Sequence, residues 1–493
     1  MDRLGVRIRE ARNKIKLSQA RLSKESGITQ AVLSGWELGK SEPSAEQFAM
    51  LMRVIDEIKE QVESGKIRLN KKQFVHDMRK TTAKPTIKDG GEYAELAKAM
   101  TITPSHAENE EFLSALSQLA ASAKQAGEKG DAPTAIALFA GCGGFSLGFR
   151  AAGFNVLGHV EINEAARDVY QANFPDSICL GTDITAIQEA DVQEWKRRFG
   201  HVHVLFGGPP CQGFSLAGKR NPADERNILF KDYLKIASIL QPDVLVFENV
   251  RLMTSMKDPD GKLFIHRFIK ELQEIGYDVK CEELNAQHYG IPQSRERVIV
   301  LGVNTRLGIK EFGLPPTTHG DPGQTDLFTY TRKRLVTFRD AVGDLETLEH
   351  GESSPSDPLH WAITHPDHVI TWLKATPEGK SAHDNEDPGL RPPSGYNTTY
   401  KRIYWDEPCS TISTNFNMIS GCRNVHPEHT RSFTIREAAR CQTFPDEFKF
   451  FGPWGEVRKM IGNAVPPLLA LQIARHIKHE LLSGHAPVPE HVR

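Results

Sequence analysis

A cysteine in a glycine- and proline-rich loop is the residue of this sequence best suited to nucleophilic chemistry. Cys211 lies in Gly207-Gly-Pro-Pro-Cys-Gln-Gly-Phe-Ser215, directly after a strand expected at 203–206. Most free cysteines are inert core side chains, but a core thiol does not require neighbours that fix so unusual a backbone path. A cation or a helix start nearby would favour the thiolate. The sequence therefore predicts Cys211 as a nucleophile.

A carboxyl group at the end of a neighbouring strand is the expected partner of this thiol. Glu248 follows the strand 244–247 in Phe247-Glu-Asn-Val250. Kept protonated by an apolar pocket, such a group can donate a hydrogen bond to a ring nitrogen and make the ring more electrophilic. A lone glutamate here would be interpreted as a helix cap. Its place beside Cys211 favours the catalytic interpretation.

A glycine-rich turn after the first expected strand is typical of a ligand site. The segment Leu138-Phe-Ala-Gly-Cys-Gly-Gly-Phe-Ser-Leu-Gly148 would let a ligand approach the backbone closely where strand meets helix. Its spacing is not Gly-x-Gly-x-x-Gly, because Ser146 stands at the third glycine, so a dinucleotide fold of the usual kind is disfavoured. Tight-turn packing would explain the glycines equally well.

Two acidic residues at the next strand ends extend this pattern. Glu161, after the strand 155–160, can accept hydrogen bonds from both ribose hydroxyls of an adenosine-bearing cofactor. Asp183, in Gly181-Thr-Asp-Ile184, can accept one from an adenine amine. Each has a simpler interpretation, a helix-start carboxylate for Glu161 and an N-cap for Asp183. Together with the glycine-rich turn, they fit an adenosyl pocket better than any one feature alone.

Short apolar runs that alternate with helical patterns must position these residues. Strands are expected at 135–139, 155–160, 203–206, 244–247 and 297–303, and helices at 163–173, 230–240 and 263–276. This alternation predicts an α/β domain with a parallel sheet and a site at the carboxyl ends of its strands. The alternation stops over 305–430, which is rich in Gly, Pro, Thr and His, and helical patterns return at 434–440 and 467–482.

The order of the motifs resembles that of the DNA cytosine-5 methyltransferases. The most specific are Pro209-Pro-Cys-Gln-Gly-Phe214 and Glu248-Asn-Val250, within a resemblance that is dense over 134–303 and 431–467. The other similar segments are Asp224-Glu-Arg-Asn-Ile-Leu-Phe230, Gln287-His-Tyr-Gly-Ile-Pro-Gln-Ser-Arg-Glu-Arg297, 431–445 and Gly462-Asn-Ala-Val-Pro-Pro467. Ala137, Thr443 and the pair 460–461 depart from the family pattern, outside the core chemistry.

This resemblance implies an S-adenosylmethionine-dependent methyltransferase fold, with a Rossmann-like mixed sheet and a smaller target-recognition region. S-adenosylmethionine is the implied cofactor. Glu161 would bind its ribose, Asp183 its adenine, and Asn463 would close the pocket. The remaining residues implied to line the cofactor site lie in the two loops after strands: Phe139, Gly141, Gly143 and Pro209.

The resemblance also implies how the catalytic residues act. Cys211 would attack carbon 6 of cytosine, while Glu248 protonates or hydrogen-bonds N3. Carbon 5 then takes the methyl group, and loss of its proton releases Cys211. Of the paired arginines Arg295 and Arg297, the first would hold the base or a neighbouring phosphate near the thiolate.

A stacked base is out of reach of this chemistry, so the target cytosine must be flipped out of the double helix. The stretch 305–430 lies where the family places its target-recognition region. Some of its basic residues could contact phosphates, although most are expected to be ordinary solvated surface. The candidates are 332–334, Arg391, 401–402 and Arg431.

The first 60 residues resemble the helix-turn-helix of phage repressors. The pattern runs from Leu17 to Pro43, with Ser18 as a helix cap and Gly27 as a turn. By this resemblance four side chains in or beside the third helix would face the major groove or backbone, with Gln19 on the phosphates: Thr29, Gln30, Ser34 and Lys40. The alternative is a helical packing module without DNA contact.

Overall composition is that of a globular protein with 39% hydrophobic residues and a formal net charge of −2. Local basic patches must therefore supply any attraction to phosphates. Seven widely spaced cysteines without a secretory signal indicate a reducing cytoplasm. The absence of a Cys-x-x-Cys pair argues against structural zinc, and no apolar run is long enough to span a membrane.

We therefore expect a helix-turn-helix domain at 1–60, a partly helical linker at 61–131, a catalytic domain at 132–304, a target-recognition region at 305–430, and the rest of the catalytic domain at 431–493. The expected partner is duplex DNA. The resemblance also suggests a restriction endonuclease as functional partner and repression of the protein's own gene. Two alternatives stay open, a DNA-binding regulator with a vestigial methyltransferase lobe and an RNA-directed relative. Recognition sequence and oligomeric state are not predicted.

Overall fold

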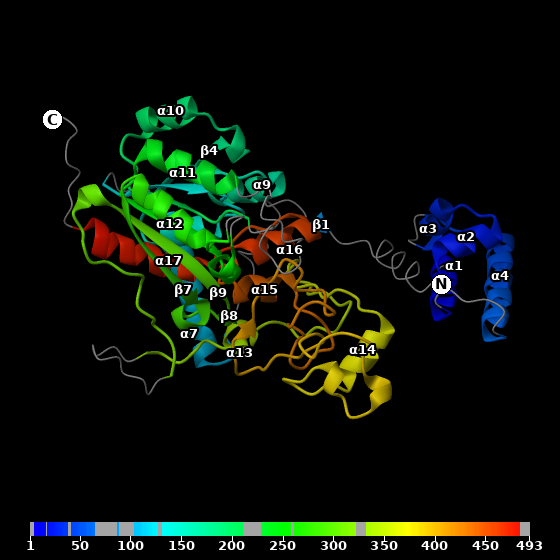
Figure 1. The fold of residues 1–493 in the computed structure, drawn as a ribbon. Helices are drawn as coiled ribbons and strands as arrows, with labels where there is room; N and C mark the ends of the chain where they lie inside the picture. The colour runs from blue at the N-terminus through cyan, green and yellow to red at the C-terminus, as the bar shows by residue number, and fades with distance from the viewer. Residues whose placement is uncertain are drawn as a thin grey trace. The chain divides into compact units, whose positions relative to one another are not determined.

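The computed structural model describes residues 4–15, 17–37, 41–64, 86–87, 103–126, 131–210, 228–257, 261–321 and 332–483. The chain divides into two compact units, 1–85 and 86–493 (Figure 1). The predicted nucleophile Cys211 and the predicted DNA contact Lys40 lie outside the described ranges. In the part of the chain that the structure describes, no helix is both long and apolar enough to cross a membrane.

The described residues of the N-terminal unit form four helices: α1 (Leu4–Lys14), α2 (Gln19–Ser26), α3 (Gln30–Glu37) and α4 (Ala45–Glu63). Ser18 caps α2 as predicted, because its side chain accepts a hydrogen bond from the N–H of Arg21. Gly27 ends the same helix in the left-handed conformation, with φ 71°, which glycine adopts without strain. A capping box of Ser44 and Gln47 begins α4.

A small apolar core and a buried ion pair fix α3 within this unit. The core contains Ile8, Leu17, Leu22, Leu33, Trp36, Leu51, Ile55 and Ile58. α1 and α3 pack so closely that a Cβ added at Gly5 would lie 2.0 Å from the backbone oxygen of Trp36. Arg12 donates to both carboxylate oxygens of Glu37, at 2.8 and 2.7 Å.

A seven-stranded mixed sheet is the centre of the larger unit, with the order β4-β3-β2-β5-β6-β9-β7. Its parallel strands are β2 (Thr134–Leu138), β3 (Asn155–Val160), β4 (Ile178–Gly181), β5 (Val204–Gly207) and β6 (Val244–Val250). β9 (Glu296–Asn304) pairs antiparallel with β6 and with β7 (Tyr277–Asn285). The methyltransferase-like mixed sheet is thus confirmed, whereas alternation alone had predicted a parallel one.

Both faces of this sheet are buried. Ala135 and Ala137 of β2 belong to one core, and Ile136 and Leu138 to the other. The second core packs under α10 (Glu189–Phe199), α11 (Ile228–Leu240) and α12 (Phe264–Glu274). β7 was not predicted from the sequence, because it is an edge strand whose exposed residues include Lys280, Glu282 and Glu283.

Helices from distant parts of the chain cover the other face. They are α7 (Ala107–Lys124), α8 (Gly144–Ala151), α9 (Glu164–Asn173), α16 (Trp454–Asn463) and α17 (Pro467–His476). α7 arises from the stretch expected to be a linker. It packs its Phe112 and Leu116 into this core, and the amide of Asn109 donates to the backbone oxygen of Asp340 at 2.8 Å.

The remaining elements are short. Three of them are helices: α13 (Phe338–Val342), α14 (Asp367–Lys374) and α15 (Ile435–Cys441). Four short strands form two pairs, β1 (Thr86–Ile87) with β11 (Gly452–Pro453) and β8 (Gln293–Ser294) with β10 (Cys409–Ser410). Single turns complete the described chain: Ile184–Ala186, Arg251–Ser255, Ala286–Tyr289, Thr305–Leu307, Ala382–Asp384, Pro388–Leu390 and Ile477–Leu482.

Candidate active site

The root of the Cys211 loop lies against the predicted acid. Gly208 follows β5, and a Cβ added there would lie 2.7 Å from Oε2 of Glu248. Asn249, the residue after Glu248, donates from Nδ2 to the backbone oxygen of Pro209 at 3.3 Å. Neither Gly208 nor Asn249 was predicted as a site residue, although both lie within quoted motifs. Together they hold the backbone two residues before Cys211 beside the carboxylate.

Glu248 is paired with one of the two predicted arginines. Nε of Arg297 lies 2.8 Å from Oε1 of Glu248, and both side chains are largely buried, at 13% and 11% exposure. The sheet sets this contact: Glu248 is registered with Ile299, and Arg297 is two residues away on the neighbouring strand, a diagonal pair on one face. The surroundings of Glu248 therefore include a guanidinium, not only the apolar pocket expected from the sequence.

Arg295 is buried deeper and contacts backbone. Its Nη1 donates to the oxygen of Ile412 at 2.9 Å, and its Nη2 donates to the oxygens of Gly462 and Ala464 at 3.0 and 3.1 Å. Burial, together with the charge of Arg297, lowers the pKa of Arg295. Its Nε finds no acceptor among the described residues. The predicted contact of Arg295 with a base or phosphate stays a prediction.

Two buried glutamines join Arg295 in a polar cluster that sequence reasoning missed. Gln293 accepts from the N–H of Ile412 at 2.8 Å and donates to Oε1 of Gln442 at 2.9 Å. Gln442 in turn donates to the oxygen of Ile461 at 2.5 Å. The cluster therefore ties the end of the recognition region to the α16–α17 connection, which contains Asn463. Both glutamines stand in quoted motifs, but only the fold brings them together.

The glycine-rich turn and Glu161 meet at the ends of β2 and β3, joined by a hydrogen bond. Phe139 and Gly141 adopt positive φ, 53° and 56°, and Gly143 has φ 100°. Oε2 of Glu161 accepts from the N–H of Gly141 at 2.8 Å. A Cβ at Gly141 would meet nothing within 4 Å, so its backbone faces open space, whereas one at Gly143 would lie 2.3 Å from the Phe174 ring.

The other predicted cofactor residues lie at the same strand ends or near the C-terminus. Asp183 uses Oδ1 to cap the turn 184–186, accepting from Thr185 N and Oγ1 at 2.9 and 2.7 Å. The simpler N-cap interpretation thus applies to this oxygen, and Oδ2 has no partner within the described ranges. Asn463 is exposed at the end of α16. Ile162, beside Glu161, is 68% exposed and was not predicted.

Known proteins resemble the chain over this same region. Residues 134–479 match the family model of the C-5 cytosine-specific DNA methylases, which is well over half of the chain. A type II methyltransferase of Haemophilus parahaemolyticus, M1.HphI, is 36% identical, covering 70% of this chain and 86% of its own length. The type II methyltransferase M.DdeI of Desulfomicrobium norvegicum is 32% identical, covering 69% and 88%. The chain belongs to this family.

Two further comparisons concern the fold and the N-terminal unit. A crystal structure of an E. coli prophage protein described as a DNA modification methyltransferase has a TM-score of 0.54 and 23% identity, covering 70% of this chain and 99% of its own. Residues 8–60 match a helix-turn-helix family model. The protein is thus a DNA methyltransferase of the C-5 cytosine family with a helix-turn-helix domain.

In the helix-turn-helix domain the predicted DNA-contacting residues divide into two groups. Thr29 and Gln30 are exposed and Ser34 is half-buried. Gln19 is 3% exposed, and its Nε2 donates to Oε2 of Glu37 at 2.8 Å. In this arrangement the Gln19 side chain is not placed to make the expected phosphate contact. Its amide instead donates to Glu37, the same carboxylate that pairs with Arg12.

The basic residues named for the recognition region divide in a similar way. Arg402 and Arg431 are 4% and 1% exposed, so the expectation that they contact phosphates is wrong for this arrangement. Arg402 donates to backbone oxygens, and Arg431 pairs with Glu437 at 2.8 Å. Lys333 and Arg334 stay on the surface, paired with Glu111 and Asp340.

Burial disfavours the thiolate of four of the methyltransferase's other described cysteines: Cys142, Cys281, Cys422 and Cys441. Burial raises the pKa of Cys142 to about 12 and that of Cys281 and Cys422 to about 11. Cys409 and Cys441 are fully buried side by side, whereas Cys179 is exposed. The raised pKa values disfavour Cys142, Cys281 and Cys422 as nucleophiles, and the role of Cys211 stays a prediction.

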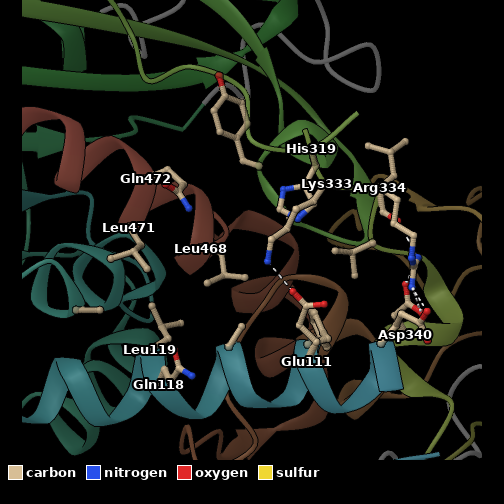
Figure 2. A pocket seen from close by; sticks show the side chains of 18 of the residues that line it. Glu111, Gln118, Leu119, His319, Lys333, Arg334, Asp340, Leu468, Leu471 and Gln472 are labelled. Carbon is tan, nitrogen blue, oxygen red and sulfur yellow. Dashed lines mark hydrogen bonds and ion pairs between the residues drawn. The ribbon is translucent and has the colours of Figure 1, made fainter. Parts of the chain in front are cut away.

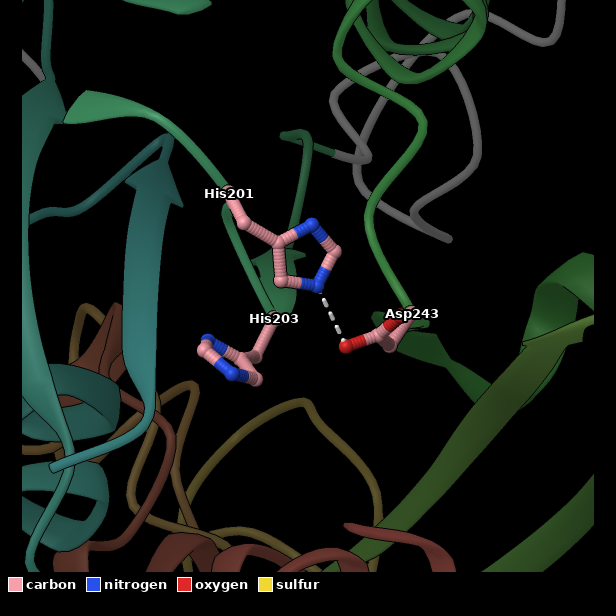
Figure 3. A group of neighbouring side chains, drawn as sticks. All are labelled: His201, His203 and Asp243. Carbon is pink, nitrogen blue, oxygen red and sulfur yellow. Dashed lines mark hydrogen bonds and ion pairs between the residues drawn. The ribbon is translucent and has the colours of Figure 1, made fainter. Parts of the chain in front are cut away.

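A histidine cluster lies at the opposite ends of the central strands, directly before β5 and β6 (Figure 3). His201, His203 and Asp243 place their ligand atoms within 4.8 Å of one another, which could hold a metal ion. Nδ1 of His203, however, accepts from the N–H of Thr134 at 3.1 Å, and Arg306 lies 2.6 Å from Asp243, where its charge opposes a cation. These contacts favour a hydrogen-bonded network.

Figure 2 shows a cavity between α7, α17 and residues 332–336, and its volume is about 340 Å³. The phosphate-contact candidates Lys333 and Arg334 line it, but none of the predicted catalytic or cofactor residues does. The Glu111–Lys333 ion pair, at 2.6 Å, crosses it. A second cavity of about 430 Å³ is lined by Trp405, His426 and Glu437, among others. Both are separate from the strand-end site.

Proposed function

We propose that this methyltransferase transfers a methyl group from S-adenosylmethionine to carbon 5 of a flipped-out cytosine in a specific duplex DNA sequence. The observation that supports this best is the carboxylate of Glu248, held by Arg297 at 2.8 Å and facing the root of the Cys211 loop. A nucleophile, an acid and a cation at one strand end are what addition to a pyrimidine ring requires.

The turn 139–143 fits S-adenosylmethionine. Open space over Gly141, at positive φ, is a cradle that a side chain would fill. Glu161 would bind the ribose, the open Oδ2 of Asp183 the adenine amine, and the exposed Ile162 would cover an adenine face, with Gly143, Pro209 and Asn463 at the margins. When bound, the cofactor supplies an electrophilic methyl group. The backbone N–H groups, carboxylates and apolar side chain at these strand ends support the proposal.

In the proposed reaction the thiolate of Cys211 forms a bond from Sγ to carbon 6 of cytosine. The electron pair of the C5–C6 double bond moves toward carbon 5 as N3 takes a proton or hydrogen bond from Glu248. Oε2 serves this role, because Oε1 is bound by Arg297. After carbon 5 gains the methyl group, a water molecule takes its proton, and the electron pair of that C–H bond re-forms the C5–C6 double bond. The Sγ–C6 bond breaks with its electron pair left on sulfur, and N3 returns its proton to Glu248.

The charge balance at the site supports a thiolate. Arg295 and Arg297 are two cations near the single carboxylate of Glu248. An excess of positive charge stabilises an anion placed beside it. Arg297 orients Glu248 directly, whereas the three backbone oxygens on Arg295 make it a positioning residue for the recognition end and Asn463.

Methyl transfer from radiolabelled S-adenosylmethionine to duplex DNA and to RNA tests this proposal. The wild type should label duplex DNA, and Cys211→Ala should lose transfer by at least about 10⁴-fold. Cys179→Ala, at an exposed cysteine, is the matched control and should retain it. Transfer retained by Cys211→Ala would refute the mechanism, loss of DNA transfer by the wild type would favour a vestigial lobe, and labelling of RNA instead would favour an RNA-directed enzyme.

The division into domains at 1–60, 61–131, 132–304, 305–430 and 431–493 is part of the proposal, with 305–430 reading the target.

We also propose that the enzyme protects cytoplasmic DNA from a cognate restriction endonuclease, as the relatives' type II naming suggests. Through its helix-turn-helix it would repress its own gene. Deleting residues 1–60 should raise expression from its promoter; unchanged expression and promoter binding would end the autoregulation idea.

A further inference from the structure

α3 exposes an apolar side chain, although other apolar side chains of the same helix are buried in the core of the N-terminal unit. Val32 is 42% exposed, and within 4–15, 17–37 and 41–64 it is the large hydrophobic side chain found at the surface. Leu33 and Trp36 of the same helix lie in the core. A β-branched residue also lowers helix propensity, since it loses side-chain freedom there. Neither core packing nor helix formation therefore accounts for a valine at this position.

Polar residues precede and follow Val32 along the sequence of α3. Thr29 and Gln30 are exposed and Ser34 is half-buried. Within the described ranges, no side-chain hydrogen bond engages these three residues, in contrast to Gln19, whose amide is held by Glu37. An amide, two hydroxyls and an isopropyl group are thus presented from one short helix.

The frame around α3 keeps this surface in place. Its C-terminal end is held by the Arg12–Glu37 ion pair, and its backbone packs against α1 at Gly5 with no room for a side chain. Residues 8–60 match a helix-turn-helix, a motif whose second helix enters the major groove. Duplex DNA is the occupant that fits an exposed α3 with these groups.

The major groove offers one apolar group for such a side chain. Thymine carries a methyl group on carbon 5, and apolar side chains recognise it by contact. 5-Methylcytosine carries the same methyl group at the same ring position, whereas cytosine has only a hydrogen there. The reaction proposed for the larger unit adds this group to cytosine.

We propose that Val32 reads the 5-methyl group of pyrimidines, so that the helix-turn-helix binds a site bearing thymine or 5-methylcytosine more tightly than the same site with uracil or cytosine. This inference rests on the proposed function only for the source of 5-methylcytosine. The N-terminal unit is then a sensor of the product made by the larger unit. DNA that the enzyme has already methylated holds the helix-turn-helix more firmly.

Selection from a random duplex library with the full chain, without S-adenosylmethionine, provides the sites to test. Sequences enriched by the wild type but not by Gln30→Ala are those read by α3. Each is then made in four versions, with thymine or uracil and with cytosine or 5-methylcytosine at single positions, and Kd is measured for each. The variants compared are wild type, Val32→Ala and Val32→Ile.

We expect at least one position where the methyl group tightens binding about 3- to 10-fold, the effect of burying one methyl group. Val32→Ala should reduce that ratio to near one, and Val32→Ile should keep it. The proposal is overturned if the ratio persists in Val32→Ala, if no position responds to the methyl group, or if no site depends on Gln30.

Methyl transfer by Val32→Ala on DNA that lacks an α3 site provides the internal control. It should equal that of the wild type, because Val32 belongs to the separate N-terminal unit. If the wild type itself transfers no methyl group, the proposed function fails. The thymine–uracil comparison still decides the reading of the methyl group, so the two failures are distinguishable.

Discussion

Strands β6 and β9 carry a carboxylate–arginine pair at each of their two ends. At the carboxyl end of β6, Glu248 pairs with Arg297 at 2.8 Å, and at its start Asp243 pairs with Arg306 at 2.6 Å. The two pairs occupy similar places in the strand pairing. Glu248 is registered with Ile299, and the backbone oxygen of Asp243 accepts a hydrogen bond from the N–H of Asn304. In each pair the arginine lies two residues from that partner.

The surroundings of the two pairs differ far more than the pairs themselves. Among the described residues, no hydrogen bond or ion pair engages Oε2 of Glu248, which lies beside the backbone of Gly208, three residues before Cys211. Asp243 uses both oxygens within the fold, one for Arg306 and one for His201 at 2.7 Å. A carboxylate oxygen without a partner beside the nucleophile's loop can take part in the reaction. A carboxylate whose two oxygens are both bound serves only to stabilise the fold. The comparison predicts that the two ends respond differently to the same substitutions.

The largest difference is expected for the carboxylates. Glu248→Gln should lower kcat by about 10² to 10⁴-fold, because an amide cannot transfer a proton at N3. Asp243→Asn should leave kcat within about twofold, since its ion pairs act only on the fold. Single-turnover methyl transfer, with circular dichroism to check folding, measures both. Equal losses would show that the open oxygen is not what separates the two ends.

The arginines should differ next. Arg297→Met should lower kcat by about tenfold or more, because Glu248 loses the group that orients it. Arg306→Met should instead reduce the free energy of unfolding by about 1 kcal/mol or less, since solvent screens a pair in which Arg306 is 39% exposed. Urea unfolding and kcat, determined on both variants, test this. A catalytic defect in Arg306→Met would contradict the division.

Gly208 tests whether the open oxygen needs its space. Gly208→Ala would place a Cβ 2.7 Å from Oε2 of Glu248, so the carboxylate must move. We expect a loss of about tenfold in kcat from this misplacement. Gly313→Ala is the control, because a Cβ there meets nothing within 4 Å. If both variants react at the wild-type rate, Oε2 does not act from the position that the structure gives it.

The smallest effect is a pH dependence of the structural end. Burial lowers the pKa of His203, so the folded state keeps the ring neutral at a pH where the unfolded chain binds a proton. Stability should thus decline as pH falls from about 6.5 toward the folded pKa, a shift in Tm of roughly 1–2 °C. Differential scanning calorimetry at pH 7 and pH 5.5 should show a weaker decline in His203→Gln. An unchanged decline would assign it to other groups.

Asp243 should not contribute to the change in stability between pH 7 and pH 5.5. Although burial alone would raise the pKa of Asp243, the hydrogen bond and charge of His201 and the guanidinium of Arg306 hold it below its usual value. A lowered carboxyl pKa gives stability that is present above the unfolded value and is lost only as pH falls through the folded pKa. The ion pair therefore persists through the measured range.

Local patterns predicted the elements around the site better than they predicted contacts. Apolar runs located β2, β3, β5, β6 and β9, since buried strands need continuous apolar sequence. Edge strand β7 was missed, because its exposed residues break such a run. Helix caps such as Ser18 were found from residue types a few positions apart. Gln19 and Arg431 look like solvent-facing polar residues in sequence, and only packing shows that they are buried.

The sequence by itself determined the family, the order of the motifs, and the residue types that a strand-end site contains, because those depend on spacing along the chain. Tertiary structure alone decided which arginine meets Glu248 and which oxygen stays open. It also decided that Gln293, Arg295 and Gln442 form one buried cluster across segments more than 100 residues apart. Such pairings depend on strand register and on side-chain burial, and both arise only when distant segments pack together.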